Sequence, residues 1–508
     1  MKDTSGLALK PADKSITPTH LRTGADYIDS IRNDGRRVYI NGELVRDVTT
    51  HPAFRGAVKS VARLYDVASA AENSEQMTFT SPKTGRPVLR CYQIPKSPGD
   101  LALARGMSAR WAEETFGLMG RTPDHVARFL VGFAAKRNLF ADLAGESFAK
   151  TVEQYYEHAR DNHLYLSYAI VPPQIDRSKP AHQQSDPTLH CGVVKERDDG
   201  LVLKGAQQLA TGAVLSDGIY ISVIHPLPPG DEAYAFGVVV PANDPNLKIY
   251  TRRSYAQGAT SEFDYPLSSR FDETDSLVVL DNVVVPWERV FFYRNPVLCR
   301  DQWWKTPAHS YGNHQAQVRY STKLRFLMGL TKRLCQITGV DAMPPVQVQL
   351  GEMAAYATIV DSMVKAQEFQ ATVDSDGVVW PSKQALYSVM ALQPDINPKM
   401  LNIARELAGG AMIMLPSSVK DFESPEIASD LERYIASPGF KAKDRIAVLK
   451  MAWDLIGSEF AGRHEQYEKF YGGASFLVRQ NMARNYDFDA ATSMVERALA
   501  LPKESELG

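Results

Sequence analysis

The stretches Ile219-Tyr-Ile-Ser-Val-Ile224 and Tyr234-Ala-Phe-Gly-Val-Val-Val240 are short runs of β-branched and aromatic residues. Leu201-Val-Leu-Lys204 and Leu277-Val-Val-Leu280 have the same character. Gly, Pro, Asn and Asp gather between these runs, as in Pro228-Pro-Gly-Asp231. Short apolar runs separated by regular turn signals predict an antiparallel β domain in the middle of the chain.

Helical patterns lie on both sides of this β region. Before it, the segments 52–65 and 101–119 have helix-like spacing. After residue 296, apolar residues recur at intervals of three and four, which places them on one face of a helix. These residues are Leu327, Leu330, Leu334 and Ile337; Leu350, Met353, Ala357, Val360 and Val364; and Ile446, Leu449, Trp453 and Ile456. With the segment 397–415, in which Gly409-Gly410 predicts close packing or a break, they predict a four-helix bundle.

We therefore expect an α+β chain of three domains. A helical N-terminal domain covers 1–155, a middle β domain covers 156–292, and a C-terminal helical bundle covers 293–508. The length of 508 residues agrees with about three domains at roughly 150 residues each.

Composition excludes several classes of protein. With 57 Lys+Arg and 59 Asp+Glu, the net charge is −2, which disfavours nucleic acid as the main partner. No run of about 18 apolar residues predicts a membrane span, and the first residues lack the apolar segment of a signal peptide. The four cysteines are scattered, so we expect neither a disulfide framework nor a metal site, and a cytoplasmic location.

Known catalytic and nucleotide-binding motifs give no further lead. The sequence has no GxGxxG after a strand and no GxxxxGK[ST], so a Rossmann crevice is not expected. The absence of HExxH and GxSxG weakens a zinc or serine hydrolase interpretation. Chemistry must therefore come from less regular polar clusters.

Two such clusters lie in the first 180 residues. In Gly120-Arg121-Thr-Pro-Asp124-His125, the Thr-Pro pair suits a helix start. The segment is either only that cap, or it presents Arg121 and His125 to a ligand as a cation and a titratable group. In Tyr168–Arg177, two prolines stiffen the chain before Gln174, which suits ligand contact or a structural corner.

Histidine and threonine supply two further candidates. Thr211 precedes Gly212 after a predicted strand, so its hydroxyl either hydrogen-bonds a flat ring edge or closes a turn. His309 and His314 precede the helix expected at 318–337, where a histidine is either a general base or a structural residue.

The last cluster is Gly457–Glu465. Small residues such as Gly462 stand beside Arg463 and His464, and guanidinium groups match phosphate oxygens. The segment therefore predicts a pyrophosphate contact or, alternatively, a charged helix end.

Taken in order, these and other segments resemble one family: the flavin-dependent aromatic hydroxylases typified by the large component of 4-hydroxyphenylacetate 3-monooxygenase. The resemblance covers nearly the whole chain. The matching segments are Arg22–Ile28, Asp47–Arg55, Met119–Asp124, Pro172–Arg177, Asp264–Glu273, Asp281–Glu288 and Trp453–Glu465.

The resemblance implies an acyl-CoA-dehydrogenase-like fold, with an antiparallel β-barrel between the helical domains, and a homotetramer. It also implies a two-component system, in which a separate NAD(P)H:flavin reductase supplies reduced FAD as a diffusible cosubstrate, with no stable complex required. O2 then gives a flavin C4a-hydroperoxide that hydroxylates a phenolic ring. Such a site needs a dry pocket and a base that activates the phenol.

Roles for individual residues follow from the same resemblance. Arg121 matches a residue that borders substrate and flavin. Flavin contacts are implied for Gln174, Arg177 and Thr211. Further cofactor contacts are expected of Tyr168 and, at a segment that approaches FAD from the same or another subunit, of Gly462, Arg463 and His464.

Two departures concern the substrate. The 4-hydroxyphenylacetate enzymes have Tyr where this chain has His125, and His where it has Tyr168. The sequence therefore looks more like the chlorophenol and nitrophenol monooxygenase branch. His314 is the expected phenol-deprotonating base, with His309 and His125 as the other candidates.

Several alternatives stay open. They are a 4-hydroxyphenylacetate-type 3-hydroxylase, a biosynthetic aryl hydroxylase, and a non-catalytic flavin-binding protein. Attack ortho or para to the hydroxyl, with or without loss of a substituent, is also open. A 4-hydroxybutyryl-CoA-dehydratase-like enzyme with an iron–sulfur cluster is disfavoured, because its relatives carry cysteines where this chain has Arg121 and His125.

Overall fold

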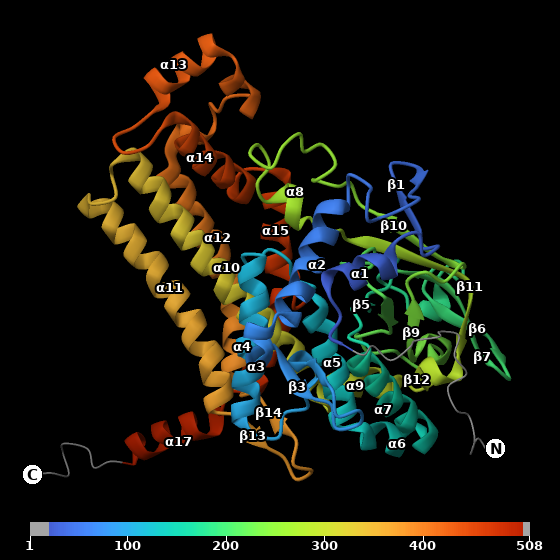
Figure 1. Cartoon of the computed structure of the whole chain (residues 1–508). Helices are drawn as coiled ribbons and strands as arrows, with labels where there is room; N and C mark the ends of the chain where they lie inside the picture. Colours follow the sequence, from blue (N-terminus) through green and yellow to red (C-terminus); the bar gives the residue numbers. More distant parts are fainter. Residues whose placement is uncertain (1–19, 501–508) are drawn as a thin grey trace, which may run out of the picture.

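The computed structural model describes residues 20–500. Helices form most of the first region, two β-sheets form the second, and long helices form the third. Figure 1 shows the long C-terminal helices on the left, several N-terminal helices in the centre and the sheets on the right. Buried apolar side chains from all three regions form one continuous core. The predicted order of helices, sheet and helical bundle is confirmed, within one packed unit.

The N-terminal helices surround the start of the chain. They are α1 (Gly24–Ile31), α2 (Arg55–Ser69), α3 (Ser74–Met77), α4 (Pro98–Glu114), α5 (Pro123–Ala135), α6 (Arg137–Ala144) and α7 (Glu146–Asp161). The helix predicted over 101–119 stops at Glu114, because Phe116 and Gly117 have φ values of +53° and +69°. Such left-handed backbone cannot continue a right-handed helix.

Two sheets form the middle region. The larger has the strand order β2-β1-β10-β11-β7-β6 and the smaller has β12-β9-β8-β5. The strands are β1 (Arg37–Ile40), β2 (Glu43–Leu44), β5 (Leu166–Ala169), β6 (Gly192–Arg197), β7 (Gly200–Gln207), β8 (Gly218–Ile221), β9 (Phe236–Pro241), β10 (Leu247–Thr251), β11 (Ser276–Pro286) and β12 (Val290–Tyr293). All four predicted apolar runs fall within or overlap these strands.

The sequence predicts antiparallel sheets, but two of the strand pairs are parallel. β1 pairs with β10, and β5 pairs with β8, in parallel. Both parallel pairs bring in a strand that is separated from its partner by a long connection, which parallel pairing requires. β1 and β2 come from the first 155 residues, so the N-terminal region contributes strands to the middle sheet.

The long helices of the third region are α10 (Ala308–Thr338), α11 (Pro344–Phe369), α12 (Lys383–Ala408) and α14 (Ala442–Ile456). α9 (Pro296–Trp304) precedes them, and α13 (Pro425–Ile435), α15 (Glu459–Phe470), α16 (Ser475–Arg484) and α17 (Phe488–Leu499) complete the region. α10 packs against α4 and α5 on one side and against α11 and α12 on the other. It is therefore the main element through which the bundle meets the N-terminal helices, and α11 adds a smaller contact with α4.

Two details of the bundle differ from the sequence interpretation. α10 begins at Ala308, so His309 and His314 lie inside this helix rather than before it. α12 begins at Lys383, well before the predicted segment, and ends where Gly409 has a φ of +59°. No atom lies within 4 Å of a Cβ built on Gly409, so this glycine marks a break and not close packing. Among residues 20–500, no helix has the length and apolar character needed to cross a membrane.

Candidate functional site

Arg121, His125 and Tyr168 meet where α5 begins beside β5. The Arg121 guanidinium carbon lies 5.3 Å from the centre of the Tyr168 ring, and the His125 ring centre lies 5.8 Å from it. Phe129, one turn further along α5, packs edge-to-face on His125 at 5.1 Å. The structure thus brings together three residues that the sequence had placed in two separate clusters.

His125 is buried and has one free ring nitrogen. Its Nδ1 lies 2.8 Å from Oε1 of Gln315 on α10, whereas its Nε2 has no hydrogen-bond partner among the described residues. Burial, helped by the nearby Arg121 guanidinium, holds the pKa of His125 well below its usual range. The imidazole is therefore neutral at physiological pH, with one nitrogen able to accept a proton.

The loop that carries Arg121 is fixed by a carboxylate. Glu273 accepts hydrogen bonds from the backbone N–H groups of Gly120 (2.7 Å) and Arg121 (2.9 Å). The Arg121 side chain donates to the Tyr467 hydroxyl at 2.6 Å and lies over the Tyr467 ring at 5.2 Å. Arg121 is consequently held between two tyrosine rings, Tyr168 and Tyr467.

A second carboxylate fixes the Thr211 turn. The Thr211 hydroxyl donates to Asp275 at 2.6 Å, and Arg463 donates to the same carboxylate through Nε (2.9 Å) and Nη2 (2.7 Å). A third donor of Arg463, Nη1, reaches Glu273 at 3.2 Å. Burial alone would raise the pKa of Asp275, but the Arg463 guanidinium holds it well below its usual range. Asp275 and Arg463 are therefore a permanently charged pair.

The Gly462–His464 segment, for which the sequence predicts a cofactor contact, lies near the start of α15. Three donors of Arg463 are already engaged with carboxylates. His464 is buried against Phe460 at 4.4 Å, and both its ring nitrogens lack a partner among the described residues. Burial and the cations around it, Lys323 first, hold the pKa of His464 well below its usual range. Only Gly462 faces open space.

Gln174 and Arg177 lie on an exposed segment close to the Thr211 turn. The backbone N–H of Gln208 donates to the Val171 carbonyl at 2.8 Å, which sets the two segments side by side. Leu209, between Gln208 and Thr211 in sequence, adopts a φ of +59°, and the residue is 58% exposed. A leucine in left-handed backbone with an exposed side chain is a local strain of the kind found at ligand sites.

The structure does not bring His314 or His309 to this cluster. Successive side chains on a helix point about 100° apart, so His314 points in a different direction from Gln315, which meets His125. His314 Nε2 lies 3.0 Å from Glu368 Oε1 on α11. His309 packs on Trp304 at 4.3 Å and near Tyr387. Both histidines are buried in helix interfaces.

Sequence reasoning missed the residues that join the site together. Glu273 and Asp275 belong to no sequence motif of known function, although Glu273 ends one of the segments matched by resemblance. Gln315 follows His314 directly, and only the helix rotation shows which of the two faces α5. These three residues act through contacts between distant segments, which no local pattern reports.

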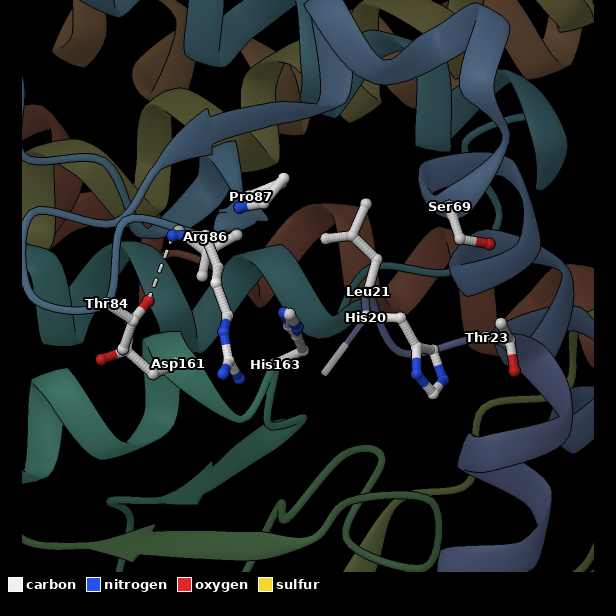
Figure 2. Close-up of a pocket in the computed structure, with 10 residues that line it drawn as sticks. His20, Leu21, Thr23, Ser69, Thr84, Arg86, Pro87, Asp161 and His163 are labelled. Atoms are coloured by element: carbon white, nitrogen blue, oxygen red, sulfur yellow. Dashed lines mark hydrogen bonds between the residues drawn. The ribbon is translucent and has the colours of Figure 1, made fainter. Parts of the chain in front are cut away.

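Two cavities lie away from this cluster, near residues 20–36 and the end of α7. One of about 320 Å³ is lined by His20, Arg86 and His163, among others, as Figure 2 shows. Burial lowers the pKa of His163 to about 4, so its ring is neutral. The other cavity, of about 380 Å³, is lined in part by Arg22 and Asp217. None of the sequence-predicted site residues lines either cavity.

Comparison with known proteins agrees with the resemblance. The family model described as 4-hydroxyphenylacetate 3-hydroxylase N terminal matches residues 23–292, and the corresponding C-terminal model matches residues 299–500. The chain is 36% identical over 485 residues to the 4-hydroxyphenylacetate 3-monooxygenase oxygenase component of Pseudomonas aeruginosa, covering 94% of this chain and 91% of that protein. It is 35% identical over 478 residues to the 4-nitrophenol 2-monooxygenase oxygenase component of a Rhodococcus species, covering 92% and 89%.

Solved structures show the same architecture. The crystal structure of the oxygenase component of 4-hydroxyphenylacetate 3-monooxygenase, complexed with FAD and 4-hydroxyphenylacetate, superposes with a TM-score of 0.89 at 33% identity. The alignment covers 94% of this chain and 98% of that one. Two family models that together span most of the chain, and relatives above 30% identity over more than nine-tenths of it, lead to one conclusion. The chain belongs to the 4-hydroxyphenylacetate 3-hydroxylase family.

Proposed function

We propose that this chain is the oxygenase component of a two-component, flavin-dependent monooxygenase that uses reduced FAD and O2 to hydroxylate a phenol. One observation carries the proposal. Arg121, His125 and Tyr168 meet at a point where a neutral histidine keeps a buried, unpartnered Nε2. A cation, a proton acceptor and aromatic rings are the groups that a phenol needs in order to bind and lose its proton.

The surface beside Thr211 fits a flat cofactor. Leu209 offers exposed apolar surface, and Thr211 follows it by two residues. Gln174 and Arg177 lie on the exposed segment whose Val171 pairs with Gln208. We assign these three polar residues to holding FAD. Bound there, reduced FAD together with O2 would supply the oxygen atom that enters the ring. Arg463 would act indirectly, by fixing Thr211 through Asp275.

The residues around His125 would prepare the phenol. Tyr168 and Phe129 would pack on the ring of the phenol, and His125 Nε2 would accept the proton of the phenol hydroxyl. The Arg121 cation, 5.3 Å from the Tyr168 ring, would stabilise the phenolate that remains. A phenolate is more electron-rich than a phenol and so reacts faster with an electrophilic oxygen. We assign the base to His125 in place of His314, because His314 is hydrogen-bonded to Glu368 in another interface.

The exchanged residues bear on the substrate class. His125 and Tyr168 stand where 4-hydroxyphenylacetate enzymes have Tyr and His, so we favour a phenol with a chloro or nitro substituent over 4-hydroxyphenylacetate. A separate NAD(P)H:flavin reductase would be the functional partner, as in the oxygenase components to which the chain is similar.

We further propose that the chain assembles as a homotetramer. Strongly exposed apolar side chains occur on the last helices and at the ends of the bundle, and exposed apolar surface is a common sign of a protein interface. They include Phe369, Ile413, Met414, Phe476 and Leu499. Native mass spectrometry would report the assembly directly.

A panel of phenols tests the proposed function. The enzyme is supplied with NADH, FAD and a flavin reductase, and hydroxylated product is scored against hydrogen peroxide. We expect coupled product with at least one chlorophenol or nitrophenol. His125→Gln should keep reduced FAD binding and lose product, whereas His314→Gln should keep both. The proposal would be rejected in favour of a non-catalytic flavin-binding role by two results together: no phenol gives product, and reduced flavin oxidises equally fast with and without the protein.

A further inference from the structure

Gln315 connects His125 to a buried carboxylate. Its Oε1 lies 2.8 Å from His125 Nδ1, and its Nε2 donates to Asp124 Oδ1 at 3.1 Å. Asp124 is fully buried, as is Thr122, whose hydroxyl donates to the same Oδ1 at 2.6 Å. A chain of side-chain hydrogen bonds, the relay, therefore connects the Thr122–Asp124 pair through Gln315 to His125, across the interface of α5 and α10.

The relay determines which way the Gln315 amide points. Asp124 Oδ1 accepts hydrogen bonds, and so does the Thr122 oxygen, which lies 3.4 Å from Gln315 Nε2. The amide nitrogen must face these acceptors, which leaves the amide oxygen facing His125. An amide oxygen only accepts, so His125 Nδ1 must carry the hydrogen.

A neutral imidazole carries one hydrogen, and here it is on Nδ1. Nε2 is then left with a lone pair, and this is the nitrogen that is buried without a partner among the described residues. The charged groups that act on the ring are Arg121, at the start of α5, and Arg319, on α10, and both disfavour a protonated ring in the absence of a bound anion.

We propose that Gln315 is a positioning residue that fixes the tautomer of His125, so that Nε2 is always the proton acceptor for the bound phenol. This inference rests on the proposed function. In the step, the phenol O–H bond breaks and its electron pair stays on oxygen. The proton forms a new N–H bond at Nε2, and the resulting imidazolium still donates from Nδ1 to Gln315. The phenolate oxygen and the imidazolium form an ion pair beside Arg121.

The test measures the bound phenol and not turnover. Enzyme loaded with reduced FAD is kept anaerobic and titrated with 4-nitrophenol, whose phenolate absorbs visible light. The apparent pKa of the bound phenol is read from absorbance across pH. Gln315→Met keeps the approximate volume but removes the hydrogen bonds to His125, Asp124 and Thr122, so either ring nitrogen of His125 can carry the hydrogen. We expect the apparent pKa of the bound phenol to rise by about one unit, a roughly tenfold loss of phenolate at a given pH.

Two further variants make the result specific. In Gln315→Glu, one carboxylate oxygen can accept a hydrogen bond from Nδ1–H of His125. The other can accept a hydrogen bond from the carboxyl O–H of Asp124, because burial raises the pKa of Asp124 and favours its protonated form. It should restore most of the phenolate. Gln317→Met, two residues along α10, removes a buried glutamine that donates to the Leu386 carbonyl at 2.9 Å and faces the bundle. It should bind 4-nitrophenol with the wild-type pKa. A wild-type pKa in Gln315→Met would overturn the proposal, as would an equal rise in Gln317→Met.

A measurement on the unaltered protein covers the case in which Gln315→Met does not fold. In ¹⁵N-histidine-labelled enzyme, the His125 signals are identified by their loss in His125→Gln, and their shifts report which nitrogen is protonated. Protonated Nδ1 and bare Nε2 are expected, and protonated Nε2 would contradict the inference. Failure of the proposed function is separate: it would appear as no coupled product from wild-type enzyme with any phenol, whatever the tautomer.

Discussion

Glu468 on α15 allows a quantitative test of the buried charges beneath the site. Its carboxylate is fully buried and accepts from Arg319 at 2.6 and 2.8 Å, from Lys323 at 2.9 Å and from Gln393 at 2.7 Å. Burial alone would raise the pKa of Glu468, but Arg319 and Lys323 outweigh it and lower the pKa from 4.5 to about 2. That difference is roughly 2.5 units, which at 1.36 kcal/mol per unit corresponds to about 3 kcal/mol.

The perturbation is Glu468→Gln, which keeps the shape and removes the charge. Two buried cations then lose their counter-charge, and breaking a buried pair in this way costs about 3–5 kcal/mol. The folded-state pKa is lowered, so this stabilisation is fully present above pH 4.5 and is lost as pH falls from 4.5 towards 2. Wild type should therefore exceed Glu468→Gln by about 3 kcal/mol at pH 7, and the gap should narrow below pH 4.5.

The assay is urea unfolding followed by tryptophan fluorescence and circular dichroism, at one protein concentration because subunit association adds to stability. The matched control is Glu459→Gln, nine residues earlier on the same helix, which removes an exposed pair with Arg253. It should change the free energy of unfolding by less than about 1 kcal/mol. Equal stability of wild type and Glu468→Gln at pH 7, or a gap that stays constant down to about pH 3, would refute the reasoning.

Three other variants probe the site and the assembly. His125→Gln should lower product formation by about 10²-fold or more with unchanged affinity for reduced FAD, measured by anaerobic titration, and unaltered product would remove His125 from the role of base. Thr211→Val deletes the hydroxyl bonded to Asp275 and should weaken reduced FAD binding by roughly tenfold, whereas a wild-type Kd would detach Thr211 from the cofactor. Leu499→Asp places a charge on a side chain that is 78% exposed and should lower the oligomeric state seen by light scattering; an unchanged mass would place the interface elsewhere.

The regular elements of this fold could be predicted where one local pattern decided them. The apolar spacing at Leu327 to Ile337 lies within α10, and the run 277–280 lies within β11. The boundaries of the helices were harder to predict. The polar side chains of α10 before Val318 are buried, some against α5 and others against α11 and α12, so they show no apolar stripe. β1 could not be assigned to the middle sheet, since its partner β10 is about 200 residues away in sequence.

The candidate site was predictable in part. Arg121, His125, Tyr168 and Thr211 were each singled out from the sequence or from resemblance. Choosing between His314 and His125 requires knowing how α10 is rotated, because His314 meets Glu368 on α11 whereas the next residue, Gln315, meets His125 on α5. That rotation follows from where α10 begins and how it packs, which the sequence pattern did not show.

The link from Arg121 through Glu273 and Arg463 to Asp275 and Thr211 crosses all three regions of the chain. A cut at the boundary between the β region and the bundle separates Arg463 from the carboxylates of Glu273 and Asp275 to which it donates. Two halves supplied as separate polypeptides would have to associate before Arg463 could fix Glu273, which holds the Arg121 loop, and Asp275, which holds Thr211. Recombining halves from different relatives would face the same demand, since each half brings one side of a charge pairing that its new counterpart must match. We therefore expect changes here to occur in pairs. A substitution of Glu273 or Asp275 should be tolerated only with a compensating substitution of Arg463 on α15.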